Sequence, residues 1–600
     1  MDTAQTIQDN LPLGERLARR WLDDWRGAAV LVALLALASS ITSITNGFAY
    51  DDLPIIYEGD RLHDWRTLWR VFAQSYWFGE FGRDLYRPFT LFMFGIQWAV
   101  GAGHPGVFHG FSIVLYVATT IVVLALARRF LPGRAAVVGG ALWAVHPVHV
   151  EAVGNVVGQA ELWVVLTVVG ALCLYVDGRR AGMLTGARIA GIILLYIIGL
   201  LSKEHAIVLP GLMLLVEVVM RRGGVIGSGF PALRVRLLYW GLTLVSLLFL
   251  LIRWKVLGAV TGGGHHSLVA LSAGQRVFAA VGFWPEVFRL MVWPARLYAD
   301  YSPGLVTVHA RPHLVHLLAG LLFLLWATLV VIGWRRRNIP ILLGAVWFPL
   351  TFALLSNLFF ASGVLVAERT LFLPSTALVF LVGAVAQGVR LPQRWVAALV
   401  MLGGTTLVLA AVGRSAARQR TWEDSLTVFA TLVTEAPENA RGHLVLGQLY
   451  MGYGAFDRAE RFFVRAQALE PLHRISYADF LSKVGRCGEA LTILDSALVR
   501  YDFFSVGHVA RVTCLLNTKR LQEGRRRAFE GLTQGLAPEV FTRFLLVADS
   551  LLASSDSVDV RNRWVREGRP FDRTGRPYSV TVKFKQDRPF GPILNGGRPK

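Results

Sequence analysis

Long apolar runs, separated by short clusters of arginine, restrict what this chain can fold into. The first run covers residues 27–48, which is long enough to cross a bilayer as a helix. Similar runs recur as far as residue 413, and 54% of all residues are hydrophobic. We therefore expect about eleven membrane spans, at residues 28–47, 107–127, 135–150, 156–176, 188–202, 206–220, 236–257, 313–334, 339–360, 370–389 and 395–413.

The arginine clusters predict which ends of these spans face the cytoplasm. They lie at residues 128–134, 179–188, 221–236, 335–337 and 390–394. Cytoplasmic loops are enriched in arginine and lysine, so these connections are expected inside. Membrane topology explains the net charge of +21 better than nucleic-acid binding does. Two other apolar stretches, 86–102 and 277–297, would break the alternation, and we expect them to be interfacial or re-entrant on the outer side.

The composition changes after Arg414, where amphipathic periods of about 3.6 residues replace the apolar runs. The window 439–471 has the small and aromatic residues of a tetratricopeptide repeat (TPR), and 472–502 and 505–536 repeat the pattern more loosely. The sequence therefore predicts an all-α protein, a polytopic membrane helix bundle followed by a TPR-type α-solenoid. Its expected parts are a cytoplasmic N-terminus (1–26), a membrane domain (27–414, with an outer loop at 48–106), repeats (415–550) and a basic, disordered tail (551–600).

The three cysteines give no disulfide framework. One of Cys173, Cys487 and Cys514 lies inside an apolar run, so at most one bridge is possible.

Asp51 and Asp52 follow the first span, at the level of the lipid headgroups. Aspartate is common at helix starts, where it caps free N–H groups. A carboxylate pair at a membrane edge is also a candidate functional site, because burying it is costly. Position alone does not decide between the two interpretations.

A second group of polar residues lies at the outer end of the span that ends near residue 150. His146, His149 and Glu151 fall within six residues and could together bind a divalent metal. The alternative is a proline-broken helix end with interfacial histidines, and we leave both open. Glu161 follows at the head of the next span and is a further candidate.

Cations and carboxylates recur in the other outer loops. Lys203 either snorkels, pairs with Glu204 in a plain loop ion pair, or holds a phosphate. Glu368 and Arg369 lie between two apolar runs, and arginine offers a planar fork that fits phosphate. Arg87, before Pro88, is a second candidate of this kind. All of these signals fall on one predicted membrane face, and no Walker A, Rossmann or zinc-protease motif is found.

Five blocks of sequence together resemble the transmembrane and TPR-containing O-mannosyltransferase family. They are Phe48–Asp52, Tyr86–Thr90, His146–Val153, Leu201–Glu204, and Ser356–Leu358 with Ala367–Ser375. They follow the order of that family over residues 45–415, and repeats come after them as in the family. The chain departs from the family at residues 158–161, which read Gly-Gln-Ala-Glu in place of Gly-Arg-Ala-Asp, and it has fewer repeats than many members.

The resemblance implies a GT-C-like membrane glycosyltransferase. Its donor would be a polyprenyl-phosphate sugar, usually mannose, and its acceptor a hydroxyl on the extracytoplasmic side, on a protein or a glycan recruited by the repeats. Asp51 or Asp52 would be the catalytic base. Arg369, with Lys203 or Arg87, would bind the donor phosphate. The cavity residues would be His146, His149, Glu151, Glu161, Glu204 and Glu368, with a divalent metal as an open question at His146, His149 and Glu151.

Two other classes of function fit parts of the sequence. The main alternative is a non-catalytic membrane anchor that displays a repeat scaffold for envelope assembly, although an anchor has no need of acids and bases on one face. A transporter or flippase fits less well, because charged residues do not recur at mid-span. In each case we expect a multi-pass protein, of the plasma or inner membrane in a bacterium and of the endoplasmic reticulum in a eukaryote.

The arginine alternation predicts a cytoplasmic N-terminus and extracytoplasmic repeats. Reporter fusions after Arg420 and within residues 179–188 should therefore report opposite sides of the membrane. A third fusion within residues 128–134 should agree with the one at 179–188. Reporters after Arg420 and at 179–188 on the same side would contradict the eleven-span arrangement.

Overall fold

The computed structural model describes residues 23–77, 85–227, 233–389, 393–502 and 504–555. Within these ranges the chain forms helices joined by turns and loops and has no β-strand, as the all-α prediction requires. The chain divides into two compact units, Met1–Tyr301 with Val306–Thr431, and Ser302–Leu305 with Leu432–Lys600. Most of the predicted cytoplasmic N-terminus and of the predicted tail lie outside the described residues.

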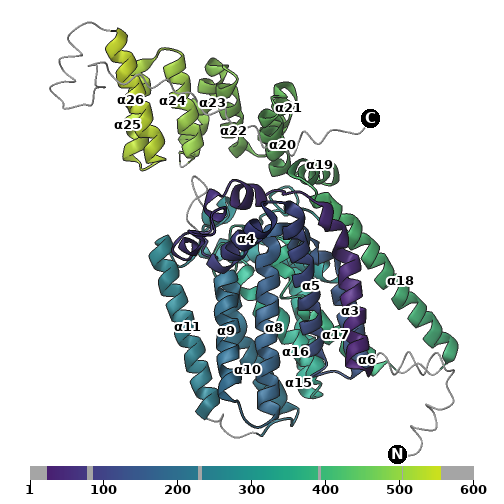
Figure 1. Ribbon diagram of the computed structural model, residues 1–600. Coiled ribbons are helices and arrows are strands. Elements are labelled where there is room, and N and C mark those ends of the chain that lie inside the picture. The colour runs from purple at the N-terminus through teal and green to yellow at the C-terminus, as the bar shows by residue number, and fades with distance from the viewer. Residues whose placement is uncertain (1–22, 78–84, 228–232, 390–392, 503, 556–600) are drawn as a thin grey trace, which may run out of the picture. The chain divides into compact units, whose positions relative to one another are not determined.

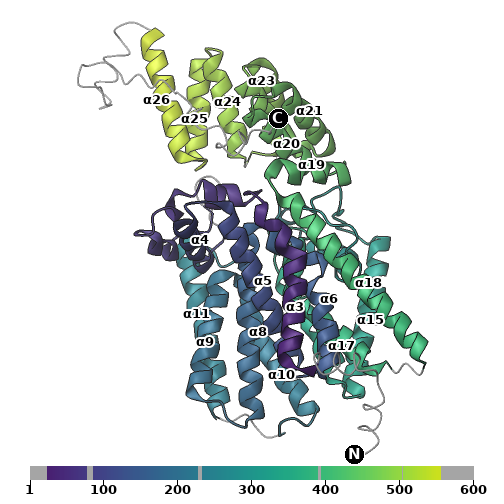
Figure 2. The same ribbon diagram turned by 45° about the vertical axis from the view of Figure 1, so that its right-hand side comes forward.

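Six helices in the described ranges are long and apolar enough to cross a membrane, and all lie in the first unit. Three of them, α3, α5 and α8, lie side by side in Figures 1 and 2, and the shorter helix α9 (Gly186–Ser202) lies next to α8. A bent pair, α6 (Gly133–Ala144) with the helix Pro147–Gly154, would make a seventh span with a bend of 50°. The six are α3 (Trp25–Ser40) extended by η1 (Ile41–Thr45), α5 (Pro105–Ala127), η7 (Val156–Gly158) with α8 (Gln159–Arg180), α11 (Leu233–Leu257), α15 (Leu314–Arg335), and α18 (Arg394–Gln419) with η11 (Arg420–Trp422).

The other predicted spans form shorter helices, so the count of eleven stays a prediction. The spans expected at 339–360 and 370–389 are shorter than predicted, because residues 353–375 leave the α-helix for 3₁₀ turns and a loop. At 1.5 Å per residue, the 13 residues of α17 reach only about 20 Å. The shorter helices are α9 (Gly186–Ser202), α10 (Leu209–Arg222), α16 (Ile339–Phe352) and α17 (Thr376–Gly388), and the 3₁₀ turns are η9 (Ala353–Leu355) and η10 (Glu368–Leu371).

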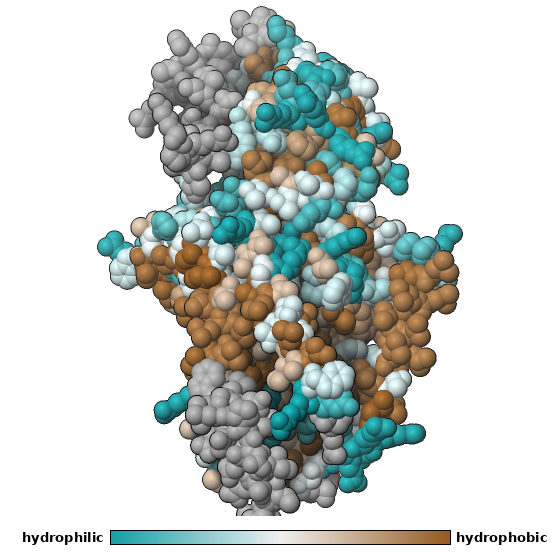
Figure 3. All heavy atoms as spheres, turned by 90° about the vertical axis from the view of Figure 1, so that its right-hand side faces the viewer, coloured by the Kyte–Doolittle hydropathy of each residue, from teal (hydrophilic) through white to brown (hydrophobic). Residues whose placement is uncertain are grey.

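Apolar side chains cover the outside of the first unit. Helices α11, α15 and α18 expose large hydrophobic residues along most of their length, among them Trp240, Leu317 and Leu399. On the face drawn in Figure 3, hydrophobic side chains gather at the level of the long helices of this unit. A soluble surface rarely exposes so much contiguous apolar area, whereas the lipid-facing side of a membrane helix does. The first unit therefore has the surface that the predicted membrane domain requires.

The connections between helices sort by chemistry onto the two ends of the first unit. Arginine-bearing connections are held together at one end, where Arg129 pairs with Asp177 and Arg134 with Asp23. The motif-bearing segments, which lie after α3, around η7, between α9 and α10, and at η10, meet through Asp52 with Val157, Arg369 with Asp51, and Lys203 with Glu161. The segments that carry the motifs thus meet at one end of the first unit, and the side of the membrane on which that end lies stays a prediction.

The loop after α3 is a compact structure of short turns. Its elements are a π-helical turn η2 (Leu53–Tyr57), η3 (Asp60–Leu62), η4 (Leu68–Ala73) and the helix α4 (Pro88–Gly101). Their apolar residues form a core of their own with Phe108 of α5 and Val156 of η7. With 14 residues α4 is too short for a span, in keeping with the interfacial or re-entrant prediction, and the stretch at 277–297 is likewise split, into α13 (Ala273–Gly282) and α14 (Trp284–Val292).

The second unit is a series of helix pairs. Each predicted repeat window contains two helices joined by a short turn, and Gly454 and Gly485 take the positive φ angles that two of these turns need. In the first pair the ring of Phe463 lies against Gly447, where an added Cβ atom would come within 3.1 Å of the ring. The assignment of these pairs to a TPR-type solenoid stays a prediction. The pairs are α20 (Ala440–Gly452) with α21 (Phe456–Leu469), α22 (Arg474–Lys483) with α23 (Cys487–Arg500), and α24 (Ser505–Asn517) with α25 (Leu521–Thr533), followed by α26 (Pro538–Ser555).

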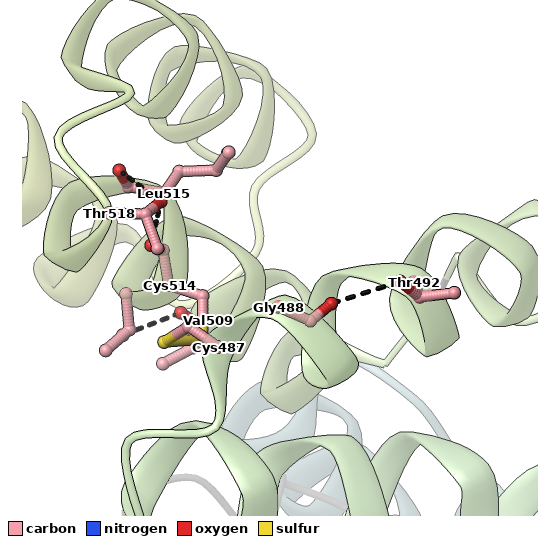
Figure 4. The surroundings of a disulfide bond; sticks show 8 residues. Cys487, Gly488, Thr492, Val509, Cys514, Leu515 and Thr518 are labelled. Atoms are coloured by element: carbon pink, nitrogen blue, oxygen red, sulfur yellow. Dashed lines mark hydrogen bonds between the residues drawn. A yellow bond between two sulfur atoms is a disulfide. The ribbon is translucent and has the colours of Figure 1, made fainter.

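One disulfide joins the second and third helix pairs, which is the single bridge that the sequence allowed. Cys487, at the start of α23, is bonded to Cys514 in α24, and their Cα atoms are 5.0 Å apart (Figure 4). Cys173 is free and buried in α8. Disulfides persist in oxidising compartments, so the bridge fits the predicted extracytoplasmic side of the repeats.

Replacing either cysteine of the bridge should weaken the second unit. The bridge closes a separation of 27 residues, and such a cross-link stabilises by roughly 3–4 kcal/mol in the chain-entropy account. The Cys487→Ser variant should therefore unfold at a lower temperature, and a peptide map without reductant should lose the cross-linked peptide. The Cys173→Ala variant should keep the cross-link. Free thiols at both positions in the untreated protein would contradict the bridge.

Candidate active site at one end of the membrane domain

Asp52 is a buried structural anchor within the site. Its Oδ1 accepts a hydrogen bond from the backbone N–H of Val157 at 2.8 Å, and its Oδ2 accepts from Val156 and Ala49, each at 3.3 Å. These bonds tie the start of the outer loop to η7. Burial raises the pKa of Asp52 to about 7, against the three backbone bonds that favour the carboxylate. With both oxygens engaged by the protein, Asp52 is poorly placed to act on a substrate.

Asp51 lies differently, with its side chain partly exposed and facing a fixed arginine. The closest approach is 3.8 Å, between Asp51 Oδ2 and Arg369 Nη2, and both side chains are 19% exposed. Arg369 is fixed from behind by Glu151, which accepts from its Nη1 at 2.6 Å and from its backbone N–H at 2.8 Å. A partly open carboxylate beside an oriented guanidinium can contact a ligand, whereas both oxygens of Asp52 are already bonded to backbone N–H groups.

The backbone just before Asp51 is held in an unusual conformation. Tyr50 has a φ of 55°, in the left-handed region that large residues rarely adopt. Its N–H donates to Ser425 Oγ at 2.8 Å, and its ring lies edge-on to Phe429. The N–H of Gly47 also donates to the carbonyl of Glu423. The segment after α18 thus imposes the turn that directs one aspartate inward and leaves the other at the open side.

Glu161 and Lys203 form a buried ion pair next to this group. Lys203 donates to Glu161, and the Nε2 atom of His205 lies 3.2 Å from the second oxygen of the same carboxylate. Burial lowers the pKa of His205 to about 4, so the ring is neutral at pH 7. Lys203 is therefore paired with Glu161 of α8, and not with its neighbour Glu204 as in the loop ion pair that the sequence left open.

Glu204 instead forms ion pairs with two arginines. Arg87 binds it as a fork, with Nε to Oε2 at 3.1 Å and Nη2 to Oε1 at 2.9 Å, and Arg253 Nη1 lies 3.9 Å from Oε2. Burial alone would raise the pKa of Glu204, but the two guanidinium groups hold it below its ordinary value. Together with the Lys203–Glu161 pair, three cations face two carboxylates in this part of the site. An excess of positive charge is what an anionic group of a ligand requires.

Glu368 faces away from Arg369, its neighbour in the chain. It accepts from the backbone N–H of Tyr298 at 2.6 Å and from the hydroxyl of Tyr301 at 2.7 Å. Burial raises the pKa of Glu368 to about 8, against the charge of Arg418. Glu368 thus joins η10 to the 298–301 segment, and its contacts are those of a structural residue.

The two histidines of the sequence motif do not fit a metal site with Glu151. His146 bonds the carbonyl of Met291 through Nε2, and His149 lies between the hydroxyls of Tyr116 and Ser375, at 3.0 and 2.8 Å. Within the ranges that the structure describes, no group of three His, Cys, Asp or Glu residues is placed to hold a metal ion. The arrangement matches the other interpretation, in which Pro147 ends α6, because the residue before a proline avoids the helical conformation.

Gln159 occupies a neutral network where the resemblance implied an arginine. Its amide and that of Gln97 bond each other at 2.9 and 3.0 Å, and its nitrogen also donates toward Ser112 Oγ at 3.1 Å. All three residues are buried. Position 159 therefore carries no charge, and the side-chain amide of Gln159 is hydrogen-bonded by Gln97.

Sequence reasoning missed two residues of the site. Arg253 lies in the apolar run of α11, near its end, and an arginine in that position of a span was itself a signal. Tyr76 lies between the quoted motif blocks, and its buried hydroxyl has no partner within the described part of the chain. No sequence pattern marked it, because tyrosine is common at membrane interfaces.

Comparison with known proteins adds the family context. The chain is 25% identical over 460 residues to the protein O-mannosyl-transferase F38B6.6 of Caenorhabditis elegans, covering 74% of this chain and 63% of the relative. It is 24% identical over 473 residues to the human protein O-mannosyl-transferase TMTC3, covering 74% and 51%. The chain thus spans between about half and two thirds of the length of these relatives. No protein-family model matches it.

Among solved structures, the oligosaccharyltransferase of Archaeoglobus fulgidus, crystallised with Zn and sulfate, aligns with a TM-score of 0.38 and 14% identity. The alignment covers 66% of this chain and 53% of that chain, a likeness too low to decide details of the fold. The sequence matches agree with the motif blocks described above, and on their evidence the chain is a homologue of the transmembrane and TPR-containing protein O-mannosyltransferases.

Proposed function

We propose that this protein is a membrane glycosyltransferase that moves a sugar, mannose in the first instance, from a polyprenyl-phosphate donor to a hydroxyl group on the extracytoplasmic side. The observation that carries the proposal is the partly exposed Asp51 beside Arg369, next to a group in which three cations face two carboxylates. A transfer of this kind needs a base for the acceptor and positive charge for the leaving phosphate. The names of the relatives supply the sugar and the protein acceptor as hypotheses.

The arrangement gives each step a residue. The acceptor hydroxyl loses its proton to Asp51 while its oxygen attacks the anomeric carbon. The bond from that carbon to the phosphate oxygen breaks, and its electrons remain on the lipid phosphate. Arg87, Arg253 and Lys203 would stabilise the charge that grows there, since each is already oriented by a carboxylate. Arg369 would position the base and contact the phosphate from the opposite side.

The first test of this proposal is transfer itself. Purified protein is incubated with radiolabelled polyprenyl-phosphate sugars and a membrane-protein fraction, and label on protein is measured. Transfer would support the enzyme over the scaffold alternative. Absence of transfer with every donor and acceptor fraction, from protein that is folded and inserted, would leave the scaffold standing.

The two aspartates should respond in opposite ways to substitution by asparagine. Asp51→Asn removes the proton acceptor, and we expect transfer to fall roughly 10²-fold or more while the melting temperature holds. In Asp52→Asn an amide nitrogen would face backbone N–H donors, and we expect a loss of roughly 1–3 kcal/mol in the free energy of unfolding.

Kinetics and thermal unfolding of both variants in detergent would check this pair of outcomes. Asp60→Asn, at an exposed carboxylate of the same loop, is the matched control and should change neither quantity. Full activity in Asp51→Asn would remove the proposed base.

The second unit is expected to recruit the protein acceptor, because every residue of the candidate site lies in the first unit. A truncation before Leu432 should keep binding of the lipid donor and lose transfer to protein acceptors. Donor binding is measured as the rise in melting temperature with a polyprenyl phosphate, and membrane insertion is checked alongside. An inserted truncation that no longer binds the lipid would contradict this division of work.

A further inference from the structure

The hydroxyl of Tyr76 is a buried polar group without a hydrogen-bond partner in the part of the chain that the structure describes. The residue is 2% exposed, and its oxygen has no hydrogen-bond partner among the described residues. Folded proteins rarely leave a buried hydroxyl unpaired, because its lost hydration is then uncompensated. Such a group is usually explained by a partner that is missing from the protein alone.

The backbone of Tyr76 is held by hydrogen bonds on both sides, and its ring packs against Arg87. Its N–H donates to the carbonyl of Leu85 at 2.7 Å, and its carbonyl accepts from Arg61. The same guanidinium bonds the carbonyl of Ser75 at 2.7 Å. The guanidinium carbon of Arg87 lies 5.2 Å from the centre of the Tyr76 ring, within range of a cation–π contact. The ring is therefore fixed between the loop core and Arg87.

The charges that act on this hydroxyl belong to the proposed active site. They are those of Arg87, Asp51, Asp52 and Arg369, which come from both ends of the outer loop and from η10. Burial raises the pKa of Tyr76, so the phenol keeps its proton at physiological pH. A phenol that stays protonated among such groups is a hydrogen-bond donor, and its strongest partner is an anionic oxygen.

We propose that the Tyr76 hydroxyl donates a hydrogen bond to a phosphate oxygen of the polyprenyl-phosphate donor and is a further binding residue of this site. The inference rests on the proposed function, since it takes the donor from there. The nearby carboxylates are weaker choices of partner. Asp52 is occupied by three backbone N–H groups, and Asp51 is needed for the acceptor proton.

Entry of the donor has to displace a neighbour of the hydroxyl, because solvent does not reach it in the free protein. The contact between Arg369 and Asp51, at 3.8 Å, is longer than the two bonds that join Arg369 to Glu151. A phosphate that took the place of this contact would bring its oxygen among the charges that surround Tyr76. Arg369 would keep its orientation, because Glu151 holds it.

The test compares Tyr76→Phe with Tyr86→Phe in the full-length protein. Tyr86 is a matched control, since it is buried at the end of the same loop and its hydroxyl donates to the carbonyl of Phe72 at 2.7 Å. The probes are a polyprenyl phosphate and the polyprenol of equal chain length, each titrated against the melting temperature. The polyprenol reports the contacts of the lipid chain, and the difference between the two probes reports the phosphate.

We expect Tyr76→Phe to weaken binding of the polyprenyl phosphate about tenfold, which corresponds to about 1.4 kcal/mol, and to leave polyprenol binding unchanged. The free Tyr76→Phe protein should melt no lower than the parent, because no protein hydrogen bond is lost. Tyr86→Phe should show the reverse pattern, with a lower melting temperature and the same preference for phosphate.

Two failures of this experiment can be told apart. Equal phosphate preference in the parent and in Tyr76→Phe would overturn the role of Tyr76 and leave the proposed function intact. A parent protein that does not distinguish the phosphate from the alcohol would overturn the lipid-phosphate donor itself, and the inference with it.

Discussion

The ion pair between Arg369 and Glu151 is the contact on which the candidate site depends. Glu151 is buried, and an unpaired carboxylate there would be several kcal/mol less favourable. Because Arg369 satisfies both of its oxygens, one through the side chain and one through the backbone, the pair fixes η10 against the Val150–Gly154 helix α7. The Nη2 atom of the guanidinium, which is not bonded to Glu151, then faces Asp51. Segments more than 200 residues apart in sequence are thereby brought to the same point.

The charges of the site form two groups with different characters. Around Arg369 two carboxylates, Asp51 and Glu151, face one cation. Around Glu204 two arginines face one carboxylate, so positive charge is in excess there. A base and an anion-binding group must be close and yet must not neutralise each other. Here Arg87 and Arg253 are both oriented by Glu204, and Lys203 is oriented by Glu161, while Asp51 has only its longer contact to Arg369. The neutral pair of Gln97 and Gln159 adds no charge to either group.

Much of this arrangement follows from the sequence, because the apolar runs predict where the helices lie and the arginine clusters predict how the loops alternate. Once the spans alternate, motifs that follow every second span must meet at one end, and they do. Each of the three repeat windows likewise contains one helix pair, although α26 follows beyond them and packs on α25. What a sequence pattern cannot supply is orientation. The sequence does not distinguish Asp51 from Asp52. Their side chains differ in direction because Tyr50, just before them, is held in the left-handed conformation by Ser425 and Phe429.

Pairing partners were hidden for a similar reason. Lys203 and Glu204 are neighbours in sequence and looked like one ion pair, yet each bonds a residue of another helix or loop. Adjacent side chains at a helix end point in different directions, so proximity in the chain is a poor guide to contact. Arg253 was hidden by its surroundings, since the apolar run around it reads as a lipid-facing helix.

The buried carboxylate of Asp52 has a consequence for how this end of the protein moves. Because Asp52 accepts hydrogen bonds from Ala49 in the outer loop and from Val156 and Val157, it joins the start of the loop to the 156–157 turn as one rigid unit. Local opening of the loop would have to break these bonds together, so both segments should lose protection from hydrogen exchange in one step. The proposed base is carried on this rigid unit. The position of Asp51 relative to helix α8 is therefore set by the hydrogen bonds of Asp52, and the proposed base and the 156–157 turn should move together.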